Sequence, residues 1–550
     1  MSGSQVAKAD LLSTDGSWDG HPHVLILAFP AQGHVTPLME LAKRLAAEGI
    51  ETTFACMQYT HEKMSQAWKR SRDFRRFGHL IRLRGIDDGL PPEFNRETWS
   101  PQRDEAVRFG LEEGALELVS NLASEGRPIT CIISDFFLRW SSSLADKVGV
   151  HEWIFWPQSA ANFSIFLHTE EIISSGLDPY QAAAGNSVSK DSLVVEMGAP
   201  LSQRKQDSEV VTCIPGFPSG VPIQYLPFGT PMGDAGAEWL RKFMTECWDR
   251  VSQAQGVIGN SFEALEEDIL EGLAQRLKEV ERHAEDARRW PRSFRLVGPL
   301  VVDGILSGRA EEADETNEQI SGTSFWKEEV TECIDWLDKQ PVASVVYVAF
   351  GSLTVLTTAQ VQEVLLGLAA SGQKFLMVLR NDAIISKPLS RTESSDMALP
   401  TRLPVEEALP SGFLELYQER CKLVPWAPQA LVLAHPSVGG FFSHCGWNST
   451  LESLCCGVPI LGWPWLMDQT SNCWLVSDVW RVGLRLSCDE ANQTTKEEVE
   501  DGVRKLMEGS LAESLRARAS KIRDQAREAA RTNHIIVSLA KEIHHLALTS

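Results

Sequence analysis

Apolar residues along the chain alternate between short continuous runs and helical stripes. The run from His23 to Phe29 has the length of a buried strand, and a short loop, 30–35, follows it. Thr36 is expected to cap the next helix, with Pro37 as its first residue and Gly49 at its end. The apolar stripe of this helix consists of Leu38, Leu41, Ala42 and Leu45. Strand–helix units of this kind predict a parallel α/β architecture.

The same pattern recurs along the chain and predicts two Rossmann-like domains. Further strands are expected at 51–56, 130–135, 153–156, 344–350, 374–379 and 438–443, with a helix near 141–148. We therefore expect a flexible tail at 1–20, an N-terminal domain at 21–300 and a C-terminal domain at 301–525. A final helix at 526–550, within a helix-rich stretch that starts near Lys496, is expected to pack back on the N-terminal domain.

Three polar stretches interrupt the pattern, at 182–208, 303–323 and 384–410. They hold Gly, Ser, Pro or acidic clusters and are expected to be surface insertions or mobile loops.

Composition narrows the class of protein. A chain of 550 residues needs two or more domains, and 43% hydrophobic with 23% charged residues is typical of a soluble globular protein. The net charge of -22 argues against non-specific binding to nucleic acid or anionic membranes. No apolar run approaches the roughly 20 residues of a membrane span. The eleven scattered cysteines form no C-x-x-C pair, which favours a reducing cytoplasm over a disulfide framework or a zinc site.

The segment from Val438 to Ser453 has the pattern of a ligand-binding site. An apolar strand runs into a small polar turn and then into a helix that ends at Gly457. The first turn of a helix offers free N–H groups and a positive dipole end, where a pyrophosphate would also meet His444, Asn448 and Ser449. Glu452, one turn further on, could reach a ribose diol. The alternative is an ordinary strand-to-helix connection with a capping Ser or Thr.

A longer stretch around this segment resembles a known family. It begins with Trp426-Ala427-Pro428-Gln429 and ends with Trp463-Pro464-Trp465-Leu466-Met467-Asp468-Gln469. In content and length it is similar to the signature box of plant secondary-product UDP-glycosyltransferases. Weaker similarity runs through Gln32-Gly33-His34, Asp88-Gly89-Leu90-Pro91, Val346-Tyr347-Val348 and Phe350-Gly351-Ser352. The resemblance implies the GT-B fold, an α/β fold of two Rossmann-like domains facing each other across a cleft. It also implies that the C-terminal domain holds most of the UDP-sugar and that no metal cofactor is required.

The resemblance also assigns roles to single residues. Trp426 is expected to stack on uracil with help from Gln429, and Glu452 to bind the ribose. Ser352, His444, Asn448 and Ser449 are expected at the phosphates, and Trp447, Asp468 and Gln469 at the sugar hydroxyls. Ala427 and Gly446 complete the donor-binding set. Gln469, together with Trp447, favours glucose as the sugar.

His34 and Asp135 form the predicted catalytic pair. His34 follows the first strand, and imidazole suits a general base near neutral pH. Asp135 ends the strand 130–135, and an aspartate beside the ring would orient it and stabilise its protonated form. Taken singly, each residue could also be a loop or capping residue. The family's catalytic His and Asp fall on these two positions, which implies an inverting transfer to an acceptor hydroxyl.

The chain lacks a G-x-G-x-x-G after the first strand, a G-x-S-x-G elbow and a metal-binding D-x-D pair. The neighbouring Asp87 and Asp88 are interpreted as solvated surface charge. A catalytically inactive UDP-sugar sensor and an interaction module built from the acidic insertions remain alternatives. Met377 stands where many relatives carry Trp. The expected enzyme is a cytoplasmic monomer with a small lipophilic acceptor such as a phenolic, flavonoid or terpenoid.

Overall fold

The computed structural model describes residues 21–91, 93–94, 96, 103, 105–177, 210–228, 233–280, 290–302, 305–306, 329–386, 402–489 and 492–549. The expected tail at 1–20 and the insertion at 182–208 lie outside these residues, as does 303–323 apart from 305–306. Among the described residues, none of the helices combines the length and the apolar composition that crossing a membrane requires.

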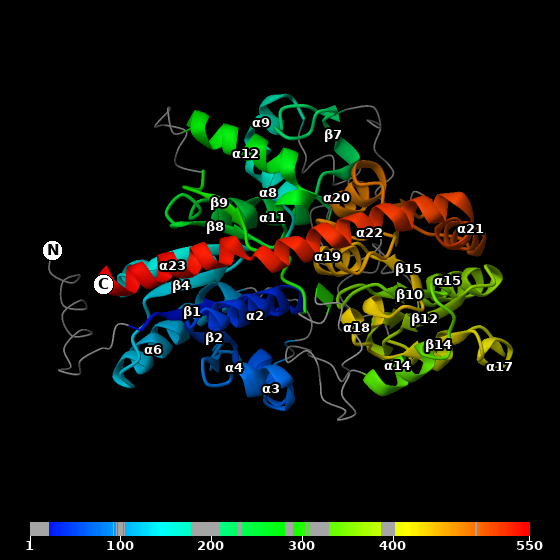
Figure 1. Cartoon of the computed structure of the whole chain (residues 1–550), viewed down its shortest axis with the longest axis horizontal. Coiled ribbons are helices and arrows are strands. Elements are labelled where there is room, and N and C mark those ends of the chain that lie inside the picture. Colours follow the sequence, from blue (N-terminus) through cyan, green and yellow to red (C-terminus); the bar gives the residue numbers. More distant parts are fainter. Residues whose placement is uncertain are drawn as a thin grey trace.

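The first domain is built on a seven-stranded parallel sheet with the order β3-β2-β1-β4-β5-β8-β9 (Figure 1). Its strands are β1 (His23–Leu27), β2 (Glu51–Met57), β3 (Ile81–Ile86), β4 (Cys131–Asp135), β5 (His151–Trp156), β8 (Gly256–Gly259) and β9 (Phe294–Leu296). Its helices include α2 (Gln32–Ala47), α3 (Gln58–Arg70), α4 (Arg72–Phe77), α6 (Leu111–Ser124), α7 (Ser141–Val148), α8 (Ala160–Leu167), α9 (Thr169–Ser174), α11 (Gly233–Trp248) and α12 (Glu267–Val280). Apolar strands β1 and β4 pair in the middle, because both of their faces are covered.

The second domain repeats the plan with a six-stranded parallel sheet, β14-β12-β10-β15-β16-β17. Its strands are β10 (Val345–Ala349), β12 (Lys374–Val378), β14 (Cys421–Val424), β15 (Val438–Ser443), β16 (Ile460–Gly462) and β17 (Gly483–Arg485). Its helices include α14 (Val330–Leu337), α15 (Thr358–Ala370), α16 (Val405–Ala408), α17 (Phe413–Tyr417), α18 (Gln429–Ala434), α19 (Trp447–Cys456), α20 (Gln469–Trp474) and α21 (Lys496–Met507). The predicted α/β architecture with two Rossmann-like domains is confirmed.

Two long helices end the chain and cross from the second domain to the first (Figure 1). Helix α22 (Gly509–Thr532) packs Ala519, Ile522 and Ala526 into the second core. It stops at Asn533, which has a left-handed φ of 45°. Helix α23 (His534–Thr549) then packs its apolar side into the core around β1 and α2. Helix α22 already contacts residues Glu263–Leu265 of the first domain, so packing of the C-terminal helices on that domain begins before α23.

Two local predictions were wrong. Helix α2 begins at Gln32, after the extended Ala31, so Thr36 does not cap it and Pro37 lies inside the helix. The stretch 384–410 is not simply a surface loop where it is described. Its first residues form β13 (Ile384–Ile385), which is buried and pairs with β11 (Leu356–Thr357), and α16 lies near its end.

Asp88 is also not a solvated surface charge, because it is 4% exposed. Its carboxylate accepts hydrogen bonds from Arg96 Nε at 2.7 Å and from the backbone N–H of Leu90 at 2.9 Å. These bonds hold the pKa of Asp88 below its ordinary value against the opposing effect of burial. The two residues therefore tie down the loop after β3.

Candidate active site

The predicted catalytic residues lie together at the carboxyl ends of β1 and β4. The Nδ1 of His34, in the first turn of α2, lies 2.8 Å from Asp135 Oδ2, and the Asp135 side chain is fully buried. The rings of Phe29 and Phe137 flank the imidazole, with centroids 5.0 and 5.1 Å away. Because the carboxylate accepts the Nδ1 proton, Nε2 is left as the basic nitrogen.

A buried ion pair supports the end of β4. Arg250, just after α11, donates to the carbonyl oxygens of Asp135 at 2.7 Å and Phe136 at 3.0 Å. The same guanidinium lies 2.8 Å from Glu152 Oε1, and both side chains are almost fully buried. The carboxylate of Glu152 also accepts the hydroxyls of Ser134, Ser141 and Ser142. Buried charges are stable when paired and hydrogen-bonded in this way, so the network fixes the turn that carries Asp135.

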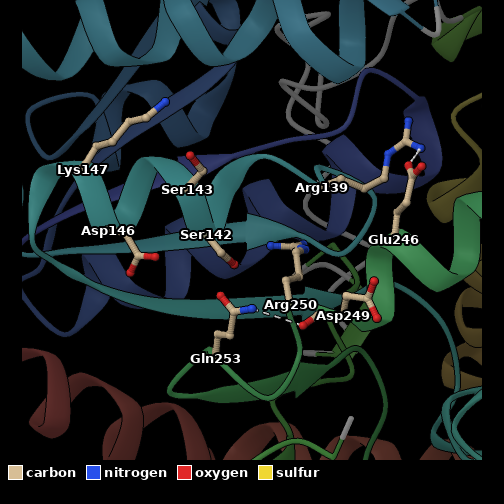
Figure 2. A pocket seen from close by; sticks show the side chains of 9 residues that line it. All are labelled: Arg139, Ser142, Ser143, Asp146, Lys147, Glu246, Asp249, Arg250 and Gln253. Atoms are coloured by element: carbon tan, nitrogen blue, oxygen red, sulfur yellow. Dashed lines mark hydrogen bonds and ion pairs between the residues drawn. The ribbon is translucent and has the colours of Figure 1, made fainter. Parts of the chain in front are cut away.

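A cavity of about 420 Å³ opens beside this network, between α7 and the end of α11 (Figure 2). Its lining includes Arg139, Lys147 and Arg250, which are paired with Glu246, Glu112 and Glu152, respectively. None of the predicted donor-binding or catalytic residues lines it. With its cations already paired, this cavity offers no evident anion site and is separate from the predicted active site.

The predicted phosphate site lies where β15 passes into α19. Gly446 is the N-cap of α19 and has no side chain that could cap it, so Trp447, Asn448 and Ser449 form an uncapped first turn. Burial lowers the pKa of His444, in the preceding loop, to about 4, and the carbonyl of Ala349 opposes this effect. Its buried Nδ1 has no hydrogen-bond partner among the described residues. A neutral imidazole and free backbone N–H groups are suitable donors for a diphosphate.

The base and ribose end is held together by Gln429, the first residue of α18. Its Nε2 donates to Ser449 Oγ at 2.9 Å and to Glu452 Oε2 at 2.7 Å. Burial raises the pKa of Glu452 to about 7, and the bond from Gln429 opposes the rise. Trp426 and the buried Ala427 precede α18 in the same loop.

Arg380 is a residue of this region that the sequence analysis missed. Its guanidinium carbon lies 6.0 Å from the centre of the Trp426 ring, and its Nη1 donates to the carbonyl of Ser352 at 2.7 Å. It thereby joins two predicted donor-binding residues. Its place just after β12, at the carboxyl end of a parallel strand, was the available signal.

The predicted sugar end lies at the start of α20. Gln469 Oε1 accepts the backbone N–H groups of Trp465 at 2.9 Å and Leu466 at 3.2 Å, which leaves its Nε2 as the donor. Asp468 Oδ2 accepts Asn472 Nδ2 at 2.8 Å. Burial raises the pKa of Asp468 to about 6, while Asn472 and the nearby His34 oppose the rise.

Contacts between the domains join the two parts of the site. Asn448 Nδ2 donates to the carbonyl of Gly33 at 2.6 Å, so this amide faces the His34 turn. The carbonyl is available because Pro37, four residues later, has no N–H to donate to it. The Trp447 indole is buried, and its Nε1 donates to the carbonyl of Asn260 at 2.7 Å. That indole N–H is therefore used between the domains, and a role of Trp447 at the sugar stays a prediction.

Comparison with known proteins identifies the family of this chain. Residues 323–526 match the family model for UDP-glucuronosyl and UDP-glucosyl transferases. UDP-glycosyltransferase 85A3 of Arabidopsis thaliana is 33% identical, over 92% of each chain. The 7-deoxyloganetin glucosyltransferase of Gardenia jasminoides is 31% identical, over 93% of this chain and 94% of its own.

A solved structure gives the same picture of the fold. The UDP-glucosyltransferase from Polygonum tinctorium, which is capable of glucosylating indoxyl, is 28% identical to this chain with a TM-score of 0.65. The alignment covers 96% of this chain and 99% of that one. The chain belongs to the UDP-glycosyltransferase family of plants and is a glycosyltransferase with the GT-B fold.

Proposed function

We propose that this enzyme transfers glucose from UDP-glucose to a hydroxyl group of a small lipophilic acceptor, with inversion at the anomeric carbon. One observation carries the proposal. The phosphate-binding turn of the second domain touches the catalytic turn of the first, through Asn448 Nδ2 and the carbonyl of Gly33, 2.6 Å apart. A donor held on α19 would therefore lie beside His34.

His34 acts as the general base. Its Nδ1 is bonded to Asp135, so Nε2 takes the proton of the acceptor hydroxyl. The acceptor oxygen forms its bond to the anomeric carbon while the bond from that carbon to the diphosphate oxygen breaks. UDP leaves with the electron pair from the opposite face, and the product is a β-glucoside. Asp135 stabilises the imidazolium that forms.

The leaving diphosphate is stabilised by groups of this chain, and the proposal requires no metal ion. The uncapped first turn of α19 supplies backbone N–H groups and the positive end of the helix dipole. The Nδ1 of His444, which has no partner within the described part of the chain, lies in the adjoining loop. Donors that already point at the developing charge are the main source of such stabilisation.

Glucose is the proposed sugar because Gln469 closes the donor box and two of the relatives are named glucosyltransferases. The acceptor is proposed to be lipophilic because Phe29 and Phe137 flank His34, and the Phe243 ring lies 5.2 Å from that of Phe137. Two relatives are named for small organic acceptors, 7-deoxyloganetin and indoxyl. A reducing cytoplasm is proposed because all eleven cysteines are free thiols.

Replacing His34 tests the mechanism. We expect His34→Ala to lower kcat for glucose transfer by about 10² to 10⁴-fold, because the general base is lost, while UDP binding is retained. Turnover is measured as UDP release and by mass spectrometry of the glucoside, over a panel of phenolic, flavonoid and terpenoid acceptors.

His435→Ala is the matched control. This histidine is also paired with an aspartate, Asp338, at 3.0 Å, but it follows α18 at the end away from Gln429. It should leave turnover unchanged. Near-normal activity of His34→Ala would refute the mechanism. A wild-type protein that binds UDP but releases none from UDP-glucose across the panel would indicate a sensor instead of an enzyme.

A further inference from the structure

A buried polar contact joins helix α8 of the first domain to helix α20 of the second. Asn162, the third residue of α8, is fully buried. Its Nδ2 donates to Asn472 Oδ1 at 3.0 Å, and its Oδ1 accepts Ser471 Oγ at 2.6 Å. Both ends of this amide are therefore used across the boundary between the domains.

This contact determines the orientation of the next amide, that of Asn472. With its Oδ1 facing the Asn162 donor, Asn472 directs both N–H groups of its Nδ2 the other way. One reaches Asp468 Oδ2 at 2.8 Å, and the other reaches the carbonyl of Cys445 at 3.0 Å. Asp468 is the proposed sugar ligand, and Cys445 lies in the turn before α19. A single amide thus connects the sugar end of the site to the phosphate end.

The start of α8 is itself firmly held. The buried carboxylate of Glu266 accepts the backbone N–H groups of Ala160 at 2.9 Å and Ala161 at 2.8 Å. Ser159 Oγ accepts the N–H of Asn162 at 3.1 Å. The Asn162 amide is therefore presented from a rigid support.

We propose that Asn162 is a positioning residue for the donor sugar, which acts through Asn472 to hold the Asp468 carboxylate in place from the opposite domain. The inference rests on the proposed function and on the predicted role of Asp468 at the sugar hydroxyls. It implies that binding of the sugar end of the donor depends on Asn162 and that binding of the uridine end does not. The side-chain bonds of Gln429 stay within the second domain, so the uridine end is independent of Asn162.

Asn162→Asp is the decisive variant, since it has the same shape but an oxygen in place of Nδ2. That oxygen would face Asn472 Oδ1, so the Asn472 amide must turn and present oxygen to the Asp468 carboxylate. We expect kcat/KM for UDP-glucose to fall by at least about tenfold, as for loss of one buried hydrogen bond to a charged group. The dissociation constant of uridine, measured by calorimetry, should stay within about twofold, the range of independent sites.

Ser164→Ala is the matched control on the same helix. Its hydroxyl is buried but finds no hydrogen-bond partner among the described residues, so kcat/KM should be unchanged. A second test uses Asn162→Ala, Asn472→Ala and the double variant. If Asn162 acts through Asn472, the double variant loses no more than Asn472→Ala alone.

Three results would overturn the inference: unchanged kcat/KM in Asn162→Asp, an equal loss of uridine affinity, or additive losses in the double variant. Failure of the proposed function is distinguishable, because it would appear as absence of glucose transfer in the wild type. In that case the ratio of the dissociation constants of UDP-glucose and uridine still reports on Asn162. A ratio unaltered in Asn162→Asp would overturn the inference by itself.

Discussion

At the scale of single residues, Glu452 gives the site a titration that can be measured. Burial raises its pKa from 4.5 to about 7, although Gln429 donates to it. The ionised carboxylate can accept both ribose hydroxyls, so affinity for the ribose is lost as pH falls through about 7. We expect uridine, which has no phosphate that titrates in this range, to bind about tenfold more weakly at pH 6 than at pH 8. Calorimetric titration at each pH provides the measurement.

Glu452→Gln is the control for this pH dependence. It should bind uridine weakly at both pH values, with a flat profile. Titration of Glu452 cannot weaken uridine binding at low pH by unfolding the protein. A carboxyl whose folded pKa lies above its unfolded value contributes more stability as pH falls from about 7 towards 4.5, the reverse of the expected loss of uridine. Equal affinities at pH 6 and pH 8 would count against Glu452 as the ribose ligand.

At the scale of elements, Pro37 shapes the contact between α2 and α19. It leaves the carbonyl of Gly33 without an intrahelical N–H partner, and Asn448 occupies that carbonyl instead. Pro37→Ala restores a competing N–H. We expect kcat/KM to fall about fivefold, the worth of one net hydrogen bond, while the thermal midpoint does not fall, because α2 gains a bond. Steady-state kinetics and thermal unfolding monitored by circular dichroism check the two parts.

The Asn448→Ala background tells whether Pro37 acts through this contact. Once the amide is gone, Pro37→Ala should change kcat/KM no further. If the effect of Pro37→Ala is the same in both backgrounds, the helix itself is responsible and the contact with Asn448 is not.

The helices and strands also show which features of the fold can be predicted from the sequence. Strand β15 and helix α7 have their predicted bounds, and Gly457 ends α19 with a left-handed φ of 74°. Such features depend on local periodicity and on residues close in sequence. The start of α2 was misplaced because an internal proline removes a helical hydrogen bond, and here a donor from outside the helix occupies the freed carbonyl. That donor, Asn448, lies 415 positions further along the chain.

The site shows the same division. The positions of His34, Asp135 and the first turn of α19 follow from the rule that parallel strands end at one edge. How the two domains meet determines the direction of the Trp447 indole and the partners of Asn162 and Asn472. Local sequence patterns do not predict these contacts between the domains. Asp88 was misread for a related reason, since Arg96, eight positions away, neutralises it within a loop without periodic structure.

At the scale of the whole molecule, the C-terminal helices connect the two domains. Helix α23 contributes Ile536, Leu539, Ala540 and Ile543 to the core of the first domain, and Glu542 pairs with Arg295 at 2.5 Å. The preceding helix, α22, packs on the second domain. The first domain therefore completes its core with residues from the far end of the chain, and its stability should depend on them.

Leu539→Ala tests this dependence. Leu539 is fully buried, so truncating it should lower the free energy of unfolding by about 2–5 kcal/mol through lost burial and the cavity left behind. Leu548 lies on the same helix and is 78% exposed, so Leu548→Ala should change the free energy of unfolding by less than about 0.5 kcal/mol. Denaturant titration of both variants supplies the comparison. Equal, small effects would mean that α23 rests on the first domain without stabilising it. A loss confined to Leu539→Ala would mean that the first domain requires the C-terminal helix to fold stably.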